Sequence, residues 1–491
     1  MIEIDTPIRA RLHGLEKQQG LLKQHLTYTD KKVDFELKKM KHASWFISRY
    51  GQEAYNEKMA ELKAARTKVL LFEDSKGMWT YSGLAWWLQS KFHGEKLTNH
   101  VQFPEAKIIP WAKVPDKEPR DYQIGMEEAL LEARHGAVEV GTGLGKSFVI
   151  LRLAKQLGLK TVIMTPSTSI ALQIFAEFEK HLGKKYVGKF FGGKKDSKKL
   201  FVVGVDDSLT KIEEGSEHWI NLSKAQVFMA DESHLCPAST LAKVCFGLMA
   251  TAPYRFFFSG TQMRNDGLDL LLDAITGKIV YRMTVKEGVE QGHLAKPMFR
   301  MIKVQSKSSF QDSDANEMTR EHLYYNASVN KAAGDLANQM ITELDRPVVI
   351  LVKEIEQFTW LLPHLKHKAK FAHGGVTKEN RADLPQEYWD SDPNALVEEF
   401  NAGELPILVG TSCITTGTDI RGVKAIISLQ GGKSEIQVKQ SVGRGTRKVP
   451  GKEDCYYLDF DVANIETLHR HAKERAAIYR DIYPDFEEFS L

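Results

Sequence analysis

The sequence predicts an α/β protein in which two successive parallel sheets, flanked by helices, follow a small α+β domain. Short apolar runs alternate with amphipathic helical segments from about residue 119, and the same alternation starts again near residue 346. Most of these runs are continuously apolar, which is typical of strands in a parallel sheet that helices cover on both faces. The first hundred residues lack this alternation and contain long charged segments instead.

The N-terminal stretch, residues 1–105, is expected to form the small domain. Its charged segments predict helices over 31–46 and 53–72. The stretch holds 17 Lys and Arg against 13 Asp and Glu, a net charge of +4, whereas the whole chain carries +3. The basic excess of the protein is therefore N-terminal, and we expect residues 1–105 to be a small basic accessory DNA-binding domain.

Three prolines, Pro104, Pro110 and Pro115, mark a linker ahead of the first strand–helix set. In that set, buried strands are predicted at GAVEV (136–140), TVIMTP (161–166), LFVVGV (200–205), QVFMADE (226–232) and RFFFSGT (255–261). In the second set they are predicted at RPVVILV (346–352), KFAHGG (370–375), PILVGTS (406–412), KAIISLQ (424–430) and CYYLDFD (455–461). Two sets imply two α/β domains, which we place at 106–295 and 296–491.

The composition is that of a globular protein, with 42% apolar and 27% charged residues among 491. A net charge of +3 excludes a polybasic or strongly acidic protein but leaves nucleic acid open, because binding depends on where the basic residues lie. The sequence contains no apolar run of membrane-spanning length and does not start with a signal-peptide pattern. Its four cysteines form no CxxC pair, so neither a zinc ribbon nor a disulfide framework is expected, and we expect a cytoplasmic protein.

The glycine-rich segment GTGLGKS, 141–147, lies between a predicted strand and a predicted helix. In that position backbone N–H groups and the helix N-terminus can enclose a phosphate, Lys146 can reach the β- and γ-phosphates, and Ser147 can ligate Mg²⁺. One departure from the P-loop pattern is Val140, which stands where that pattern has its first glycine. A dinucleotide-binding turn and a plain glycine connection are the alternatives. The predicted nucleotide-binding residues are Gly141, Thr142, Gly143, Gly145, Lys146 and Ser147.

The acidic segment DESH, 231–234, follows another predicted strand, 85 residues after Lys146. Asp231 is the expected Mg²⁺ ligand, and Glu232 is expected to orient or activate the attacking water. Two acids after a strand are more often a helix cap, but the glycine-rich segment on a neighbouring strand favours the catalytic interpretation.

The segment QSVGRGTR, 440–447, supplies the candidate catalytic residues Gln440, Arg444 and Arg447. Two arginines three positions apart on a helix face one direction, and their spacing suits a bidentate grip on a γ-phosphate. A solvated basic helix face is the alternative for such a spacing. The neighbouring glycines and the two other segments favour the phosphate grip.

Together these segments resemble the superfamily 2 helicases and translocases, with the motifs in family order over about 119–460. RDYQ (120–123), TPSTSIALQ (165–173), SGT (259–261), VVILVKEIEQFTWL (348–361) and TTGTDI (415–420) are similar to further motifs of that family. The resemblance implies two RecA-like domains that hold ATP between them, with cleft closure and reopening driving movement along a strand.

The resemblance also implies roles for individual residues. Arg120, Tyr122 and Gln123 would read the adenine, and Gly417 and Asp419 would couple strand binding to the nucleotide. Backbone contacts to nucleic acid would come from Thr165, Pro166, Ser167, Thr411 and Thr416, with helix capping as the alternative role for the hydroxyl groups. Asp206 and Asp207 depart from the family, which often carries a threonine before the Ser-Leu of this loop.

Two longer segments, 259–297 and 373–381, resemble the branch that includes the phage branch-migration helicases of the UvsW type. This resemblance implies an ATP- and Mg²⁺-dependent DNA helicase that remodels forked or branched DNA in recombination, repair or replication, in a bacterial or phage-infected cytoplasm. The alternatives are a duplex-translocating motor of a restriction system and an ATP-switched nucleic-acid sensor. RNA as the substrate and the oligomeric state, a monomer included, stay open.

Aromatic residues among lysines give the N-terminal stretch a candidate binding role. The segment 78–94 contains Trp79, Tyr81, Trp86, Trp87 and Phe92, and Lys76, Lys91 and Lys96 lie beside them. Such aromatics either stack on bases or fill the core of a small domain, and we favour the core. The lysine-rich segment 192–199 is expected to be a solvated loop that could touch a duplex backbone.

Overall fold

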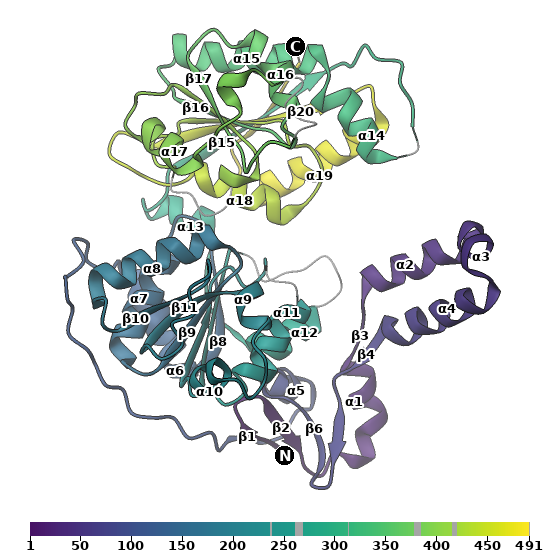
Figure 1. Ribbon diagram of the computed structural model, residues 1–491, viewed down its shortest axis with the longest axis vertical. Coiled ribbons are helices and arrows are strands. Elements are labelled where there is room, and N and C mark those ends of the chain that lie inside the picture. Colours follow the sequence, from purple (N-terminus) through teal and green to yellow (C-terminus); the bar gives the residue numbers. More distant parts are fainter. Residues whose placement is uncertain (236–237, 261–268, 313, 378–383, 415–419, 491) are drawn as a thin grey trace. The chain divides into compact units, whose positions relative to one another are not determined.

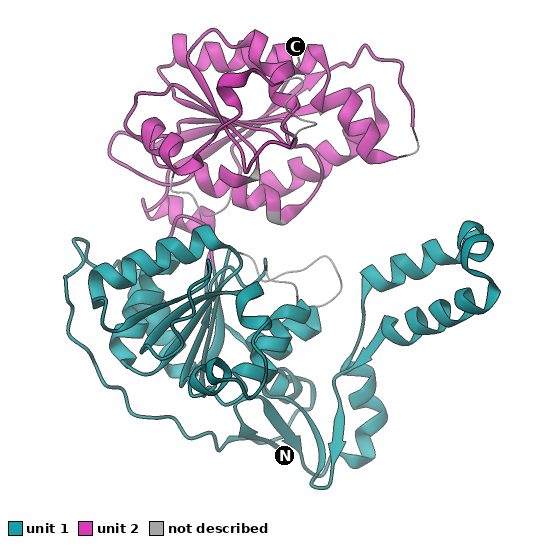
Figure 2. Cartoon of the chain, in the orientation of Figure 1, with its two compact units in different colours: residues 1–139, 146–282 teal, residues 140–145, 283–491 magenta. Residues whose placement is uncertain are grey.

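The computed structural model describes residues 1–491 except 236–237, 261–268, 313, 378–383, 415–419 and 491 (Figure 1). The chain forms two compact units (Figure 2). Unit 1 comprises residues 1–139 and 146–282, and unit 2 comprises residues 140–145 and 283–491. Among the described residues, no helix is both long and apolar enough to cross a membrane. The division into three domains at 105 and 295 stays a prediction.

Unit 1 contains a seven-stranded sheet in the order β10-β11-β9-β12-β13-β8-β14. Its strands are β8 (His135–Val140), β9 (Thr161–Thr165), β10 (Val187–Phe190), β11 (Phe201–Val205), β12 (Val227–Ala230), β13 (Tyr254–Ser259) and β14 (Ile279–Met283). All neighbouring pairs from β10 to β8 are parallel. Every residue of β9, β12 and β13 is buried, which is why these strands are mainly apolar.

Helices connect most strands of unit 1, as expected for parallel pairs. They are α6 (Asp121–Ala133), α7 (Lys146–Leu157), α8 (Thr168–Leu182), α9 (Asp206–Thr210), α10 (Glu217–Leu222), α11 (Ala238–Lys243) and α12 (Asp269–Thr276). The five strands predicted for this set are confirmed, and residues 192–199 form a loop between β10 and β11, as predicted.

The N-terminal part of unit 1 has its own five-stranded sheet in the order β5-β6-β2-β1-β7. The elements are β1 (Ile2–Thr6), β2 (Arg9–Leu12), β5 (Phe72–Asp74), β6 (Gly77–Tyr81), β7 (Leu97–Asn99), α1 (Gln19–His25) and α5 (Ala85–Lys91). Only β1 and β7 pair in parallel among the described strands of this sheet. Its core consists mainly of aliphatic side chains such as Ile2, Leu22, Leu84 and Leu88.

The aromatic segment 78–94 lies at the border of this core. Phe92 is buried, and Tyr81 and Trp87 are partly buried against the core cluster. Trp79 stacks on Phe72 at a ring separation of 4.4 Å. Packing against the core is therefore confirmed for this segment, although leucines rather than tryptophans fill the centre.

A helical hairpin rises from this sheet on the antiparallel ribbon β3 (Thr27–Thr29) and β4 (Thr67–Val69). It contains α2 (Lys31–Lys41), α3 (Ser44–Tyr50) and α4 (Gln52–Arg66), and it projects away from the rest of unit 1 (Figure 1). The predicted helix over 53–72 was wrong beyond Arg66. Residues 67–69 pair with β3 instead, because Thr67 and Val69 are β-branched and favour a strand.

Unit 2 contains a second seven-stranded sheet in the order β17-β18-β16-β19-β20-β15-β21, and every pair in it is parallel. Its strands are β15 (Lys296–Val304), β16 (Val348–Leu351), β17 (Ala369–Ala372), β18 (Ile407–Gly410), β19 (Ala425–Ser428), β20 (Asp454–Val462) and β21 (Phe486–Ser490). The five predicted strands of this set are confirmed, and β15 and β21 are additional.

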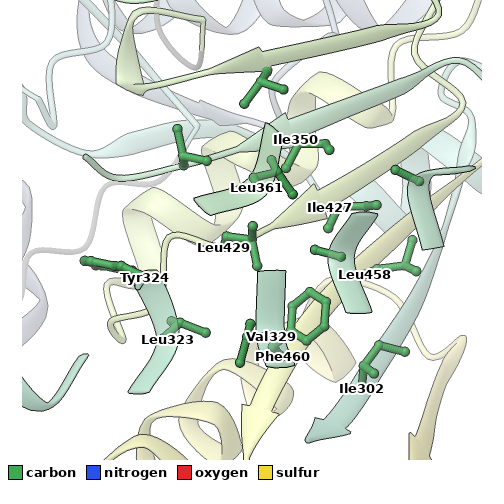
Figure 3. Packing of buried hydrophobic residues seen from close by; sticks show 14 of the residues in the cluster. Ile302, Leu323, Tyr324, Val329, Ile350, Leu361, Ile427, Leu429, Leu458 and Phe460 are labelled. Atoms are coloured by element: carbon green, nitrogen blue, oxygen red, sulfur yellow. The ribbon is translucent and has the colours of Figure 1, made fainter. Parts of the chain in front are cut away.

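Helices pack on this second sheet and close its core. They are α13 (Val285–Glu290), α14 (Ala315–Thr319), α15 (Ala327–Thr342), α16 (Gln357–Leu361), α17 (Pro393–Asn401), α18 (Glu435–Gly445) and α19 (Glu466–Ile482). Figure 3 shows Ile350, Ile427 and Leu458 of three strands meeting Val329 of α15 and Leu361 of α16. Each of these side chains is almost fully buried.

Candidate active site

The glycine-rich loop joins the end of β8 at Val140 to the start of α7 at Lys146. Gly143 has φ +93° and Gly145 has φ +77°, conformations that glycine adopts without the steric cost other residues pay. The Leu144 side chain between them is buried, so it anchors the loop. The predicted strand–loop–helix arrangement is confirmed, and it suits a bound phosphate because backbone N–H groups of such a loop converge at a helix N-terminus.

Lys146 and the acidic segment lie together within unit 1. The Lys146 side chain is 7% exposed, and its Nζ is 3.4 Å from Oε1 of Glu232. Asp231 directly follows β12 and is 4% exposed. Since β8 and β12 each pair with β13, the sheet brings two segments 85 residues apart to one edge.

Burial raises the pKa of Asp231, the charge of Glu232 adds to that shift, and Lys146 opposes it. A cation at this position would favour the ionised carboxylate. Ser147 is exposed in the first turn of α7. Mg²⁺ prefers oxygen ligands, and the Ser147 hydroxyl can supply a second one beside the Asp231 carboxylate. The described residues contain no cluster of three or more His, Cys, Asp or Glu that could hold a metal alone. These residues fit a Mg²⁺ ion whose other ligands are water and nucleotide phosphates.

Glu232 adopts the left-handed backbone conformation, with φ +47°, which costs a residue with a side chain about 1–2 kcal/mol. Its N–H donates to Oδ1 of Asp231 at 3.0 Å. Its carboxylate Oε2 lies 3.5 Å from Nδ1 of His234, and that nitrogen is 2.6 Å from Oγ of Ser259 at the end of β13. The strained backbone and this chain of contacts fix the direction of the Glu232 carboxylate.

His234 and Ser259 were absent from the predicted site residues. Both are buried, and together they connect the acidic segment to the segment 259–261, of which Thr261 lies outside the described residues. The signal was present in the sequence: a histidine three residues after the predicted metal ligand Asp231, and a serine at the end of a predicted buried strand.

The segment RDYQ forms the N-terminus of α6. The side-chain oxygen of Gln123 accepts the backbone N–H of Arg120 at 3.0 Å, and Nη1 of Arg120 donates to the Tyr122 hydroxyl at 3.1 Å. Tyr122 and Gln123 are buried. Gln123 thus takes part in a helix cap, and the adenine-reading roles of Arg120, Tyr122 and Gln123 stay predictions.

Helix capping, which was the alternative for the hydroxyl groups after the strands, is confirmed at one position. Oγ of Ser167 accepts the N–H of Ile170 at the start of α8, at 3.4 Å. Thr165 is buried, and its hydroxyl donates to the Ser167 carbonyl at 3.1 Å. Thr411 lies directly after β18, with its hydroxyl 3.5 Å from Sγ of Cys413. Strand contacts by Thr165, Pro166, Ser167 and Thr411 stay predictions.

Three of the predicted site residues, Thr416, Gly417 and Asp419, lie outside the described residues. The departure at Asp206 and Asp207 has a local explanation. Both acids occupy the first turn of α9, where the helix dipole favours negative charge.

The arginine segment is only partly helical. Gln440 and Arg444 lie on α18, but the helix ends at Gly445, and Arg447 instead forms an antiparallel bridge with Leu294. Arg447 therefore does not share a helix face with Arg444, contrary to the prediction, because α18 ends at Gly445. Arg444 is buried, and burial lowers the pKa of Arg447 to about 10.

The glycines of the arginine segment permit close packing within unit 2. A Cβ on Gly443 would overlap the side chain of Thr142 in the glycine-rich loop. A Cβ on Gly445 would lie 2.8 Å from Sγ of Cys455 on β20. A solvated basic helix would not require glycines at such close contacts. Helix α18 therefore packs against the glycine-rich loop and β20.

The fold and the site define a class of protein: an ATP-hydrolysing enzyme with two α/β units, a phosphate-binding loop and a paired lysine–carboxylate cluster. Two sequence families match in agreement with this class. Residues 116–264 match the family described as type III restriction enzyme, res subunit. Residues 333–449 match the helicase conserved C-terminal domain.

Individual relatives extend the likeness over most of the chain. The chain is 24% identical to the DNA 3'-5' translocase XPB2 of Sulfurisphaera tokodaii over 72% of this chain and 84% of that protein. It is 21% identical to the ATP-dependent DNA helicase uvsW of Enterobacteria phage T4 over 79% of this chain and 78% of that protein. In fold it is similar to the type ISP restriction-modification enzyme LlaBIII bound to DNA, with a TM-score of 0.54, 15% identity, and coverage of 77% of this chain and 31% of that one.

The chain belongs to the superfamily 2 helicases and resembles the UvsW branch of them. Its two seven-stranded parallel sheets are the tandem RecA-like domains of that superfamily. The protein is therefore an ATP-dependent helicase or translocase that acts on nucleic acid.

Proposed function

We propose that this helicase remodels forked or branched DNA, by fork regression and Holliday junction branch migration, in recombination, repair or replication. The observation that carries the proposal is the likeness to the T4 DNA helicase uvsW, which extends over more than three quarters of both chains. The basic N-terminal part ahead of the motor supports it, since a second DNA-binding element suits a substrate with several arms.

The residues of the site suit ATP hydrolysis with Mg²⁺, which supplies charge neutralisation at the phosphates when bound. Loop N–H groups and Lys146 would bind the β- and γ-phosphates. Ser147 and Asp231 would hold the metal. Glu232, which pairs with Lys146 at 3.4 Å, would then be released from that lysine to orient the attacking water and accept its proton.

A duplex-translocating motor of a restriction system is the second candidate. The family described as type III restriction enzyme, res subunit, matches residues 116–264, and this match favours it. Such a system needs a nuclease, and the sequence shows no linked carboxylate–lysine nuclease signature, so a partner would have to supply the cleavage.

The experiment compares ATP hydrolysis and product formation on single-stranded, linear duplex, forked and four-way DNA and on RNA. We expect forked and four-way DNA to stimulate hydrolysis more than linear duplex, with conversion of the junctions to the migrated products. Lys146→Ala should lower turnover by roughly 10²–10³-fold and abolish junction conversion, because it removes a preorganised charge at the phosphates.

Each alternative has its own outcome in this comparison. Displacement of a triplex strand from linear duplex without junction conversion would establish the restriction-type motor instead. An ATP-dependent change in affinity without directional movement would establish a sensor. Stronger stimulation by RNA than by any DNA would overturn DNA as the substrate.

A further inference from the structure

The helical hairpin of unit 1 exposes large aromatic side chains that folding does not use. Trp45 is 60% exposed, Phe35 57% and Tyr50 53%. They are the three most exposed aromatic side chains among the described residues, and all lie within the 16 residues 35–50. Because exposed apolar surface forfeits the free energy that burial would provide, a cluster of this kind marks an interaction site.

The rings at the tip of the hairpin form one group. The Phe46 ring lies 4.8 Å from that of Tyr50 and 5.6 Å from that of Trp45. The hairpin buries other residues for its own stability: Leu37 of α2, Ala43 before α3 and Leu62 of α4. The hairpin therefore has its own buried residues, and Trp45 and Tyr50 are exposed in spite of them.

Positive charge accompanies the rings. Residues 31–50 contain six Lys and Arg against two Asp and Glu, a net charge of +4, while α4 is neutral with three of each. Nζ of Lys39 lies 4.8 Å from the centre of the Phe35 ring, and Cζ of Arg49 lies 5.4 Å from that of Tyr50. Residues 31–50, which form α2 and the hairpin tip α3, thus carry more net positive charge than the whole chain, which has +3.

The position of the cluster suits binding to an extended ligand. The ribbon β3–β4 carries the hairpin away from the N-terminal sheet, and Gly51 with φ +87° reverses the chain between α3 and α4 (Figure 1). Alternating rings and cations at the end of an arm match a polymer with flat apolar faces and a charged backbone.

We propose that the hairpin tip binds nucleic acid, with Trp45 and Tyr50 stacking on unpaired bases where strands separate and the lysines of α2 contacting the adjacent phosphates. This inference rests on the proposed function and deepens it, because it names the element that recognises the junction. It differs from the sequence-based hypothesis about 78–94, where Tyr81, Trp87 and Phe92 pack in or against a core. A protein partner would not require the excess of lysines, and the charge therefore favours nucleic acid.

The test uses the full chain with Trp45→Ala and Tyr50→Ala and forked DNA carrying 2-aminopurine at the junction. We expect the Kd for forked DNA to rise about tenfold for each variant, since base–aromatic stacking contributes ~1–3 kcal/mol. The fluorescence change of 2-aminopurine on binding should be abolished by Trp45→Ala and kept with Trp45→Phe. Lys39→Ala combined with Lys41→Ala should lower the slope of log Kd against log salt concentration by roughly 2.

Controls separate this inference from its alternatives. Phe489→Ala removes an exposed ring from β21 of unit 2 and should leave the Kd unchanged, and ATP hydrolysis without DNA should be normal in every variant. If wild-type protein binds forked DNA and hydrolyses ATP in response, yet the hairpin variants match it within twofold, the hairpin inference fails alone. If no DNA stimulates the wild type, the proposed function fails. If Trp45→Ala leaves the DNA affinity unchanged but abolishes binding to another protein, the tip belongs to a protein partner and the inference is overturned.

Discussion

The two α/β units share a sheet plan but use charge differently. Unit 1 gathers Lys146, Asp231 and Glu232 at one edge of its sheet, where Lys146 and Glu232 are 3.4 Å apart. Unit 2 encloses a buried ion pair: Nε of Arg475 on α19 donates to Asp459 on β20 at 2.6 Å. The Tyr479 hydroxyl donates to the same carboxylate at 2.6 Å.

This difference separates charge that serves chemistry from charge that serves the fold. Burial and the neighbouring charge of Glu232 raise the pKa of Asp231, because both disfavour its ionised form. Asp459 receives hydrogen bonds from Arg475 and Tyr479, and although burial opposes the shift, that carboxylate raises the pKa of Arg475. Substitutions at the first kind of site should change activity, and those at the second should change the free energy of unfolding.

Arg444 is an exception to be tested, because this charged residue belongs to unit 2 and yet has a predicted catalytic role. Arg444→Ala should lower ATP turnover by roughly 10³–10⁵-fold, as expected when an arginine no longer stabilises the transferring phosphoryl group. Measurement of steady-state phosphate release and of nucleotide affinity should show hydrolysis abolished with ATP binding largely kept. Normal turnover in Arg444→Ala would mean that unit 2 contributes no charge to the reaction through this residue.

Asp459→Asn should have the opposite profile. It leaves the buried guanidinium of Arg475 without its counter-ion, so the free energy of unfolding should fall by about 3–5 kcal/mol. Urea denaturation followed by circular dichroism measures this decrease. The matched control is Glu488→Gln, which removes the exposed partner of Lys303 on β15 and should leave the unfolding midpoint unchanged. Equal effects of both variants would contradict the structural role of the buried pair.

The smallest expected effect concerns pH and unit 1. Burial lowers the pKa of His135 on β8 to about 3, Arg255 adds to the shift, and Nε2 of His135 lies 3.0 Å from the Ile275 carbonyl. As pH falls below 6.5 the unfolded chain binds the proton first, so the stability that the neutral imidazole contributes decreases progressively down to about pH 3.

Between pH 7 and pH 5 this should lower the free energy of unfolding by about 1–2 kcal/mol. Denaturation midpoints at the two pH values measure it. His135→Gln keeps a donor for the carbonyl but does not titrate, so its pH dependence should be shallower. An unchanged slope in that variant would exclude His135 as the origin.

The sequence predicted the central strands of both sheets because each is a continuous apolar run, as in FVVGV of β11 and AIIS of β19. It missed the edge strands β10 and β14 of unit 1. In unit 2 it missed β15 and β21, where buried and partly exposed residues alternate in KPMFRMIKV and most residues of FEEFS are exposed. Strands at or near a sheet edge keep polar side chains on the open side and have no continuous apolar run. The helix over 53–72 failed beyond Arg66 because β4 forms only where β3 is present to pair with it.

The site shows the same limit. GTGLGKS and DESH identified the phosphate loop and the acidic pair, because the chemistry requires those residue types after buried strands. The link from Glu232 through His234 to Ser259 was harder to predict, because it depends on a contact between two segments that are distant in the sequence. The helical geometry assumed for Arg447 failed because the helix ends at Gly445.

The sequence by itself determined the fold class, the order of the motifs and the ATP-dependent chemistry, because local pattern and residue type suffice for these. Only the tertiary structure decided which aromatics are buried and which are exposed. Segment 78–94 and the hairpin tip both mix rings with lysines, but the first packs against a core, whereas Trp45 and Tyr50 of the second are exposed. The physical reason is that burial depends on contacts between distant parts of the chain, which a local pattern of residues does not contain.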